Sequence, residues 1–189
     1  MTPTGRRTRA ARPTRPTSEH LEFAMPIYMK IEKPEIKGEV TAEGYEGQIA
    51  VNSFQFGAGV GVSSAAGNAG KRTASAASLS EVTVTTDLDN STGPMLDKLC
   101  AGTVLKKVTI SFTRASSKDA AGNDGYLIVT LEDVFLSGVS MSSGGDTPTV
   151  SVTLNYAKIK ALYHQGDVEG ALTKGLGFGW DLTTNKAYA

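Results

Sequence analysis

Cysteine and histidine are scarce in this chain of 189 residues, which has one cysteine, Cys100, and two histidines. One thiol cannot close a disulfide within the chain, and it cannot build a metal cluster. Beyond residue 24 the sole histidine is His164, in a polar stretch over residues 164–174 that predicts a solvated loop. Neither a Gly-x-Ser-x-Gly pattern nor paired catalytic carboxylates occur in the sequence. We therefore predict no enzymatic activity, no metal site and no cofactor.

Long apolar runs are also missing from the sequence. No stretch approaches the length of a membrane-spanning helix, and none has the apolar centre of a secretory signal peptide. We therefore expect no stable insertion into a membrane. If the protein leaves the cell, we expect it to use a route other than general export.

Net charge is absent overall, with 19 basic and 19 acidic residues, but the charges are unevenly spread. Residues 1–24 contain five Arg and two Glu, a charge of +3, so residues 25–189 carry −3. A slightly acidic body is a poor partner for nucleic acid. The first 24 residues have almost no apolar content, which predicts a disordered extension or a start codon placed upstream of the true start at Met25. Residues 25–189 are expected to form one domain.

Strands and turns account for most of what is present, with 21 Gly and many Ser and Thr. Apolar residues alternate with polar ones in segments such as Ile27–Glu32 and Val150–Tyr156, which predicts half-buried strands. The alternation changes phase around Asn52, which indicates a β-bulge. One helix is predicted over about Thr92–Ala101, since capping residues precede it and Gly102 follows it. Cys100 is expected to be a small core residue of that helix.

A long stretch of Gly, Ala, Ser and Asn covers Gly57–Ala77 and predicts a functional or disordered loop. Two nucleotide-binding motifs fail in it. The third glycine of a dinucleotide fingerprint would fall at Val62, and the Ser or Thr of a phosphate-binding loop is replaced by Arg72.

Several segments, in the same order, resemble the Hcp family, which forms the inner tube of the bacterial type VI secretion system. The resemblance covers about Met25 to Lys186, and the Arg-rich extension and the Gly- and Ala-rich stretch depart from it. The segments that carry the resemblance are Pro26–Glu32, Lys37–Thr41, Asn52–Gly57, Ser80–Thr85, Asp87–Ser91, Ser142–Asp146 and Gly179–Lys186.

The resemblance implies a mainly β fold, namely a small closed β-barrel of two packed sheets with one flanking helix. It implies a homohexameric ring, stacked rings that form the secreted tube, small effector proteins in the lumen, and a spike protein and contractile sheath as partners. It further implies a bacterial cytoplasmic location before firing and secretion without a cleaved signal peptide. The alternatives are a contractile-phage tail-tube protein and, third, an enzyme.

Particular residues also take roles from the resemblance. Gln55 lies between Phe54 and Phe56, at the position that faces the lumen and contacts effectors in the family. The aromatic neighbours should point the opposite way, into the core. The stretch after Gln55 matches the family's ring-stacking loop, which would include Gly57, Gly59, Gly61, Gly67 and Gly70.

Overall fold

The computed structural model describes residues 25–64, 72–114, 125–145, 147–166 and 172–188. They form eleven strands and one helix, which confirms the predicted mainly β fold with a single helix. The elements are β1 (Ile27–Glu32), β2 (Ile49–Val51), β3 (Ser53–Gln55), β4 (Ala58–Ser64), β5 (Arg72–Leu79), β6 (Val82–Asp87), α1 (Thr92–Cys100), β7 (Leu105–Thr113), β8 (Gly125–Ser142), β9 (Thr149–Gly166), β10 (Leu172–Asp181) and β11 (Lys186–Ala187).

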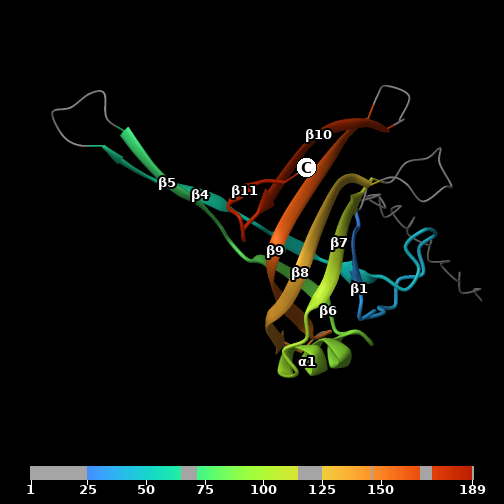
Figure 1. The fold of residues 1–189 in the computed structure, drawn as a ribbon. Coiled ribbons are helices and arrows are strands. Elements are labelled where there is room, and N and C mark those ends of the chain that lie inside the picture. Colours follow the sequence, from blue (N-terminus) through green and yellow to red (C-terminus); the bar gives the residue numbers. More distant parts are fainter. Residues whose placement is uncertain (1–24, 65–71, 115–124, 146, 167–171, 189) are drawn as a thin grey trace, which may run out of the picture.

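Nine strands form one strongly curved antiparallel sheet in the order β11-β10-β9-β8-β7-β1-β2 (Figure 1). The first half of β9 also pairs with β6, and β6 pairs with β3. Among the described strands no ladder joins β2 to β3, so the predicted closure of the barrel is not confirmed. The two strands are linked through Asn52, whose backbone N–H donates to the Thr85 carbonyl at 2.7 Å. The predicted change of phase at Asn52 is thus the point where the chain stops pairing with β1 and begins to pair with β6.

The core lies inside the curve of this sheet. Most of its fully buried side chains come from alternate positions of β1, β6, β7, β8 and β9, as the sequence alternation predicted, and β2 and α1 add one each. The largest are Met29, Ile31, Ile49, Met95, Leu105, Ile110, Leu131, Leu154 and Ile159.

The two longest strands, β8 and β9, change the face that they bury halfway along. Leu131 and Val134 are both buried on β8, and so are Tyr156 and Ile159 on β9, although strict alternation would expose one of each pair. Asp133 has a φ of 48° at this point. The resulting bend lets one half of β8 and β9 pack beside β7 and the other half beside β6.

Helix α1 covers one end of the sheet (Figure 1). Met95 is fully buried and Leu99 packs against the core, but Cys100 is exposed, so its predicted core position is wrong. At 3.6 residues per turn, Cys100 is rotated about 100° from Leu99. This rotation takes its thiol off the buried face.

Within the Gly- and Ala-rich stretch, residues 58–64 and 72–77 lie in paired strands, where a loop was predicted, and residues 65–71 lie outside the described residues. Strands β4 and β5 pair with each other as a separate two-stranded sheet that projects from the body (Figure 1). The prediction failed because backbone ladders form without an apolar alternation in the side chains. Of the residues assigned to ring stacking, Gly67 and Gly70 lie outside the described residues.

His164 lies in strand β9, so its predicted place in a loop is wrong, while residues 167–171 of the predicted loop lie outside the described residues. Its Nδ1 is 3.1 Å from the Gly125 carbonyl oxygen, and the side chain is half-buried. The polar pattern misled the prediction because β9 continues past the core to pair with β10.

Candidate functional site

Gln55 occupies the last position of the short strand β3 and is exposed. Phe54 points the opposite way and packs against the core, with its ring centroid 5.2 Å from that of Phe112 in an edge-to-face contact. Phe56 also packs against the core. The predicted directions of these three side chains are therefore confirmed, while the role of Gln55 in a lumen stays a prediction.

Gln55 belongs to a broad outward-facing surface of hydroxyl side chains. Strands β3, β6, β9 and β8 are adjacent there, and their outward residues align in rows across the strands. One row is Gln55, Thr83, Thr153 and Gly138, and the next is Ser53, Thr85, Ser151 and Ser140. Thr149 and Ser142 are paired in a third row, in which Asp87 of β6 pairs with Thr149 from the other side. We call the eight residues of the first two rows, with Thr149 and Ser142, the hydroxyl face, and Asp87 borders it.

A hydrogen bond links two neighbours within this face. Ser53 Oγ and Thr85 Oγ1 are 2.6 Å apart, directly across the β3–β6 pair. Each hydroxyl can donate one hydrogen bond and accept two, and its hydrogen rotates to suit the partner. The hydroxyl face can therefore present either donors or acceptors at the same positions.

Two carboxylates flank the hydroxyl face, and each accepts a hydrogen bond from an amide. Asn52 Nδ2 donates to Asp87 Oδ1 at 2.8 Å, and Asn155 Nδ2 donates to Glu81 Oε1 at 2.9 Å. Phe135 is paired with Asn155 across β8 and β9 and is 45% exposed. The margin is thus acidic on two sides and apolar at one corner.

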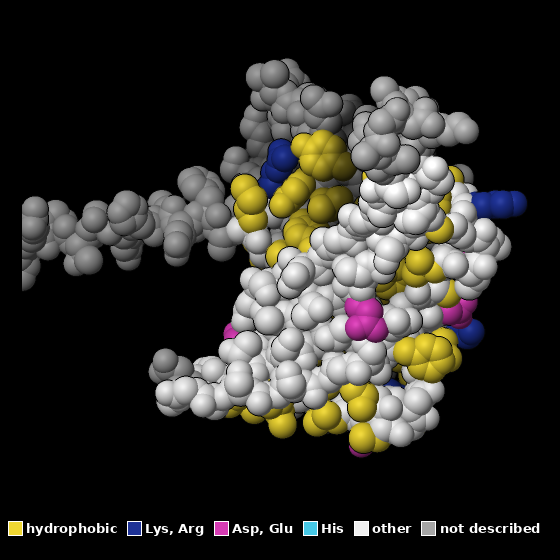
Figure 2. Space-filling model, turned by 90° about the vertical axis from the view of Figure 1, so that its left-hand side faces the viewer, with side chains coloured by type: hydrophobic (Ala, Val, Ile, Leu, Met, Phe, Trp, Pro, Cys, Tyr) yellow, Lys and Arg dark blue, Asp and Glu magenta, His cyan; other side chains and the backbone are white. Residues whose placement is uncertain are grey.

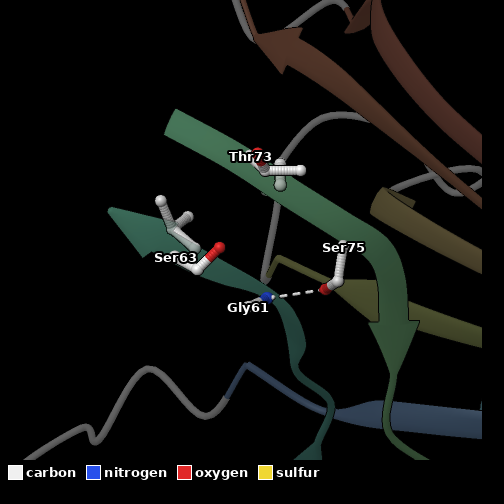
Figure 3. Close-up of a pocket in the computed structure, with 6 residues that line it drawn as sticks. Gly61, Ser63, Thr73 and Ser75 are labelled. Atoms are coloured by element: carbon white, nitrogen blue, oxygen red, sulfur yellow. Dashed lines mark hydrogen bonds between the residues drawn. The ribbon is translucent and has the colours of Figure 1, made fainter. Parts of the chain in front are cut away.

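Three of the glycines predicted to serve ring stacking lie in or next to the β4–β5 hairpin. The Gly61 N–H donates to Ser75 Oγ at 3.0 Å, beside a shallow open concavity that is lined by residues 61–63 and 73–75 (Figure 3). Gly57 makes an equivalent bond to Ser80 Oγ at 2.9 Å, whereas no other atom would approach a Cβ on Gly59 within 4 Å. Gly59 and Gly61 thus belong to the separate two-stranded sheet and not to the strands that pair beside Gln55.

Charged side chains concentrate on a different outward surface. A single row crosses six strands with alternating sign, and we call it the charge row: Glu32, Lys107, Glu132, Lys158, Asp181 and Lys186. Lys107 Nζ is 3.6 Å from Glu32 Oε2, and Tyr188 Oη donates to Glu132 Oε1 at 3.2 Å. The row lies across the other half of β8 and β9 from the hydroxyl face.

Shifts of pKa occur outside the hydroxyl face. A hydrogen bond from Lys30 lowers the pKa of Glu32, with further help from the charge of Lys107. Hydrogen bonding by Thr183 lowers the pKa of Asp181. Burial raises the pKa of Tyr156 to about 12, and its hydroxyl donates to the Ser80 carbonyl at 2.8 Å. Each shift has a local structural cause, and the three groups do not converge.

No cluster of three or more potential metal ligands occurs among the described residues. In the same part of the chain, no helix has the length and apolarity needed to cross a membrane. The ionisable groups of the hydroxyl face margin are tied to amides, and none lies against a histidine or an activated hydroxyl. This surface is suited to binding rather than to proton transfer.

Most of the hydroxyl face is not predictable from the sequence alone. Thr83, Thr85, Ser151 and Thr153 were visible only as the polar half of two alternating segments. The missing information was the register that places β6 between β3 and β9, because that pairing joins residues far apart in the chain.

The comparisons with known proteins find similar proteins of one kind. A family model described as "Type VI secretion system effector, Hcp" matches residues 28–163. "Protein hcp1" of Pseudomonas aeruginosa is 29% identical over 108 residues, which span 56% of this chain and 65% of that protein. The match thus spans just under two thirds of that relative.

Solved structures share the fold. One described as a type six secretion system protein superposes with a TM-score of 0.77 at 24% identity and covers 87% of this chain and all of its own. Hcp1 from Salmonella typhimurium has a TM-score of 0.68 at 21% identity, covering 87% of this chain and 99% of its own.

Proposed function

The chain belongs to the Hcp family of type VI secretion proteins, and we propose that six copies close into a ring whose stacked rings form the secreted inner tube. Small effector proteins would travel in the lumen, with the hydroxyl face around Gln55 lining it. In such a ring the neighbouring copies, rather than a closed ladder within one copy, complete the barrel-like wall. The role is structural and transporting.

The β4–β5 hairpin is the observation that carries this proposal. Within the described part of the chain, β4 and β5 pair only with each other, and Val60 and Val62 on β4 are 50% and 55% exposed. Unpaired strand edges and exposed apolar side chains are a hazard for a free monomer. A second copy that covers the hairpin would remove this hazard, and the head-to-tail contact would continue from ring to ring.

Further partners follow from the proposed assembly. A contractile sheath would surround the tube, and a spike protein would cap its end. The protein would be held in the bacterial cytoplasm before firing and would then be secreted with the tube, without a cleaved signal peptide. The phage tail-tube alternative gains no support of its own from the comparisons.

The proposal is tested by the size of the assembly. Size-exclusion chromatography with light scattering should give about six protomers, the closed cyclic state that this proposal requires. Electron microscopy should show rings with a central channel. A chain that starts at Met25 should assemble alike, since residues 1–24 have little apolar content to pack. A monomer at every concentration tested would contradict the proposal.

The hairpin is tested by a double substitution, Val60→Ser with Val62→Ser. It should leave single rings intact but reduce their stacking into tubes, because it removes exposed apolar area from the hairpin. Leu88→Ser is a matched control, since Leu88 is 45% exposed but lies away from the hairpin. Equal tube formation by both variants would remove the hairpin from the contact.

A further inference from the structure

We propose that four aromatic side chains from four different strands form a docking surface for the Arg- and Pro-rich segment Arg12–Pro16 of the same chain. We call these side chains the aromatic row: Phe54, Phe112, Tyr126 and Tyr163. The proposal does not depend on ring formation, because the surface and the segment belong to one copy.

The aromatic row is continuous across β3, β7, β8 and β9. Successive ring centroids along it are 5.2, 6.3 and 6.4 Å apart, and every contact is edge-to-face. A register shift between Phe112 and Thr113 makes Tyr126 an extra residue of β8, and a bulge of this kind re-aims a side chain. Tyr126 contacts the rings on both sides of it, so the four rings form one surface.

The row keeps apolar surface within reach of a ligand. Tyr163 is 43% exposed, and the other three rings are only partly buried. One of the groups of hydrophobic side chains visible in Figure 2 lies beside a basic side chain near the upper end of the molecule. Aromatic rings have a large apolar area and a negative face, so an accessible row of them suits a ligand that is both apolar and cationic.

One arginine already shows which chemistry the row accepts. The Cζ atom of Arg114 is 4.7 Å from the centroid of the Tyr126 ring. A guanidinium is planar and weakly hydrated, so it stacks on an aromatic face that attracts its charge. Because Arg114 stacks on Tyr126, the more exposed Tyr163 is the ring best placed for a second arginine.

The Arg- and Pro-rich segment is connected to the fold beside the row. The Thr113 N–H donates to the Pro26 carbonyl at 3.0 Å, one residue after Phe112. Met25 is 59% exposed at this point. Eight residues, 17–24, join Pro16 to Met25. An extended chain gains about 3.3 Å per residue, which is enough to reach any ring of the row, and the short tether gives a high effective concentration.

The sequence of the segment, Arg-Pro-Thr-Arg-Pro, matches the row in chemistry and spacing. Pro13 and Pro16 fit the PxxP pattern, which favours a polyproline II helix with three residues per turn. At about 3.1 Å per residue the two prolines lie on one side, about 9 Å apart, and Arg12 and Arg15 share an adjacent side. Such segments dock on aromatic surfaces because the helix is preformed and loses little entropy on binding.

Photo-cross-linking of the full chain tests the docking. Thr14 is replaced by the photoreactive amino acid benzoylphenylalanine, and the cross-linked residues are identified by mass spectrometry. Cross-links are expected at the aromatic row and its immediate neighbours. On a denaturing gel, a cross-link within one copy keeps the mass of one chain, whereas a cross-link between copies doubles it.

A variant of the row locates the contact. Tyr163→Ser should lower the yield of cross-links at least about three-fold, because the most exposed ring of the row is lost. Phe135→Ser is the matched control, since Phe135 is 45% exposed but lies at the corner of the hydroxyl face. The control should cross-link like the unchanged chain.

Variants of the segment test its chemistry without altering the described fold. Pro13→Ala with Pro16→Ala should lower the yield at least about three-fold, because the preformed helix is lost, whereas Pro3→Ala should not. Arg15→Lys keeps the charge but loses the planar stacking group, so it should also lower the yield. Arg6→Lys is its matched control and should have no effect.

The outcomes decide the proposal even if Tyr163→Ser unfolds, because the segment variants remain. Cross-links scattered over the surface, or a doubled mass on the gel, would overturn it. A yield that the double proline variant leaves unchanged would overturn it as well, and so would a folded Tyr163→Ser variant with full yield. Docking within one copy, with the losses expected for the variants, would support it whether or not six-protomer rings form.

Discussion

Replacing Thr86 with valine should stabilise the domain. Thr86 lies on β6 with its side chain fully buried, and its Oγ1 has no hydrogen-bond partner among the described residues. It faces the core beside Val150, its partner across the β6–β9 pair. A buried hydroxyl without a partner costs about 1–3 kcal/mol. Valine keeps the shape of threonine and removes that cost.

The expected gain in unfolding free energy is about 1–2 kcal/mol, the lower part of that range, because a neighbour can relax toward the hydroxyl. For a domain of this size it corresponds to a rise in melting temperature of about 2–8 °C. The matched control is Thr113→Val, at a site that is 4% exposed. Thr113 Oγ1 donates to the Pro26 carbonyl at 2.9 Å, so its loss should cost about 1 kcal/mol.

Urea unfolding followed by the fluorescence of Trp180 measures both variants. The protein concentration must be the same throughout, since association would itself add stability. Opposite signs for the two threonines are expected. A loss of stability in Thr86→Val that equals the loss in Thr113→Val would refute the reasoning, since both hydroxyls would then be contributing hydrogen bonds.

Three further predictions follow from the site and its surroundings. Gln55→Arg should leave the ring intact but weaken cargo co-purification. Phe54→Ala should lower the unfolding free energy by about 2–3 kcal/mol, which is less than the cost for a fully buried aromatic. If Gln55→Arg abolished folding and Phe54→Ala had no effect, the assignment of Phe54 to the core and of Gln55 to the outward surface would be contradicted. Gly179→Ala should release the Tyr188 segment, because the added Cβ would overlap the Tyr188 carbonyl oxygen, while Gly59→Ala has open space and serves as the control; equal hydrogen exchange at Tyr188 in both would contradict this. The lowered pKa of Glu32 means that its contribution to the free energy of unfolding is fully present above the ordinary carboxyl pKa and is lost as the pH falls through the lowered value. Glu32→Gln should therefore make the free energy of unfolding less dependent on pH in this range, by well below ~1 kcal/mol because the side chain is partly exposed. An acid-unfolding profile identical to that of the unchanged chain would contradict this.

Local patterns were enough to predict several elements of this fold. The strand at Ile27–Glu32 and the helix at Thr92–Cys100 follow from alternation and capping, which are properties of neighbouring residues. The same parity correctly placed Phe54 inward and Gln55 outward. The sequence thus predicts which side chains of a strand point into the core and which point outward.

The pairings between distant segments could not be predicted from such local patterns. The hydroxyl face depends on β6 lying between β3 and β9, and on the bend at Asp133 that turns β8 and β9. The hairpin was missed because its small residues carry no alternation, and its ladder is made by the backbone. Cys100 was misplaced because a rotation of one residue on a short helix decides whether a side chain is buried.

The charge row bears on the fidelity of folding. A strand that slips by one residue turns its apolar side chains outward, so burial alone rejects that error. A slip by two residues that brings Lys107 opposite Thr130 keeps both side chains on the outward face, so burial alone does not reject it. The charge row disfavours this slip, because Lys107 would then lose its partner Glu132. Each pair of opposite charges on neighbouring strands contributes about 0.2–1 kcal/mol, so the pairs together disfavour a misaligned sheet. Reversing one charge in the middle of the row would weaken the pairs on both sides of it.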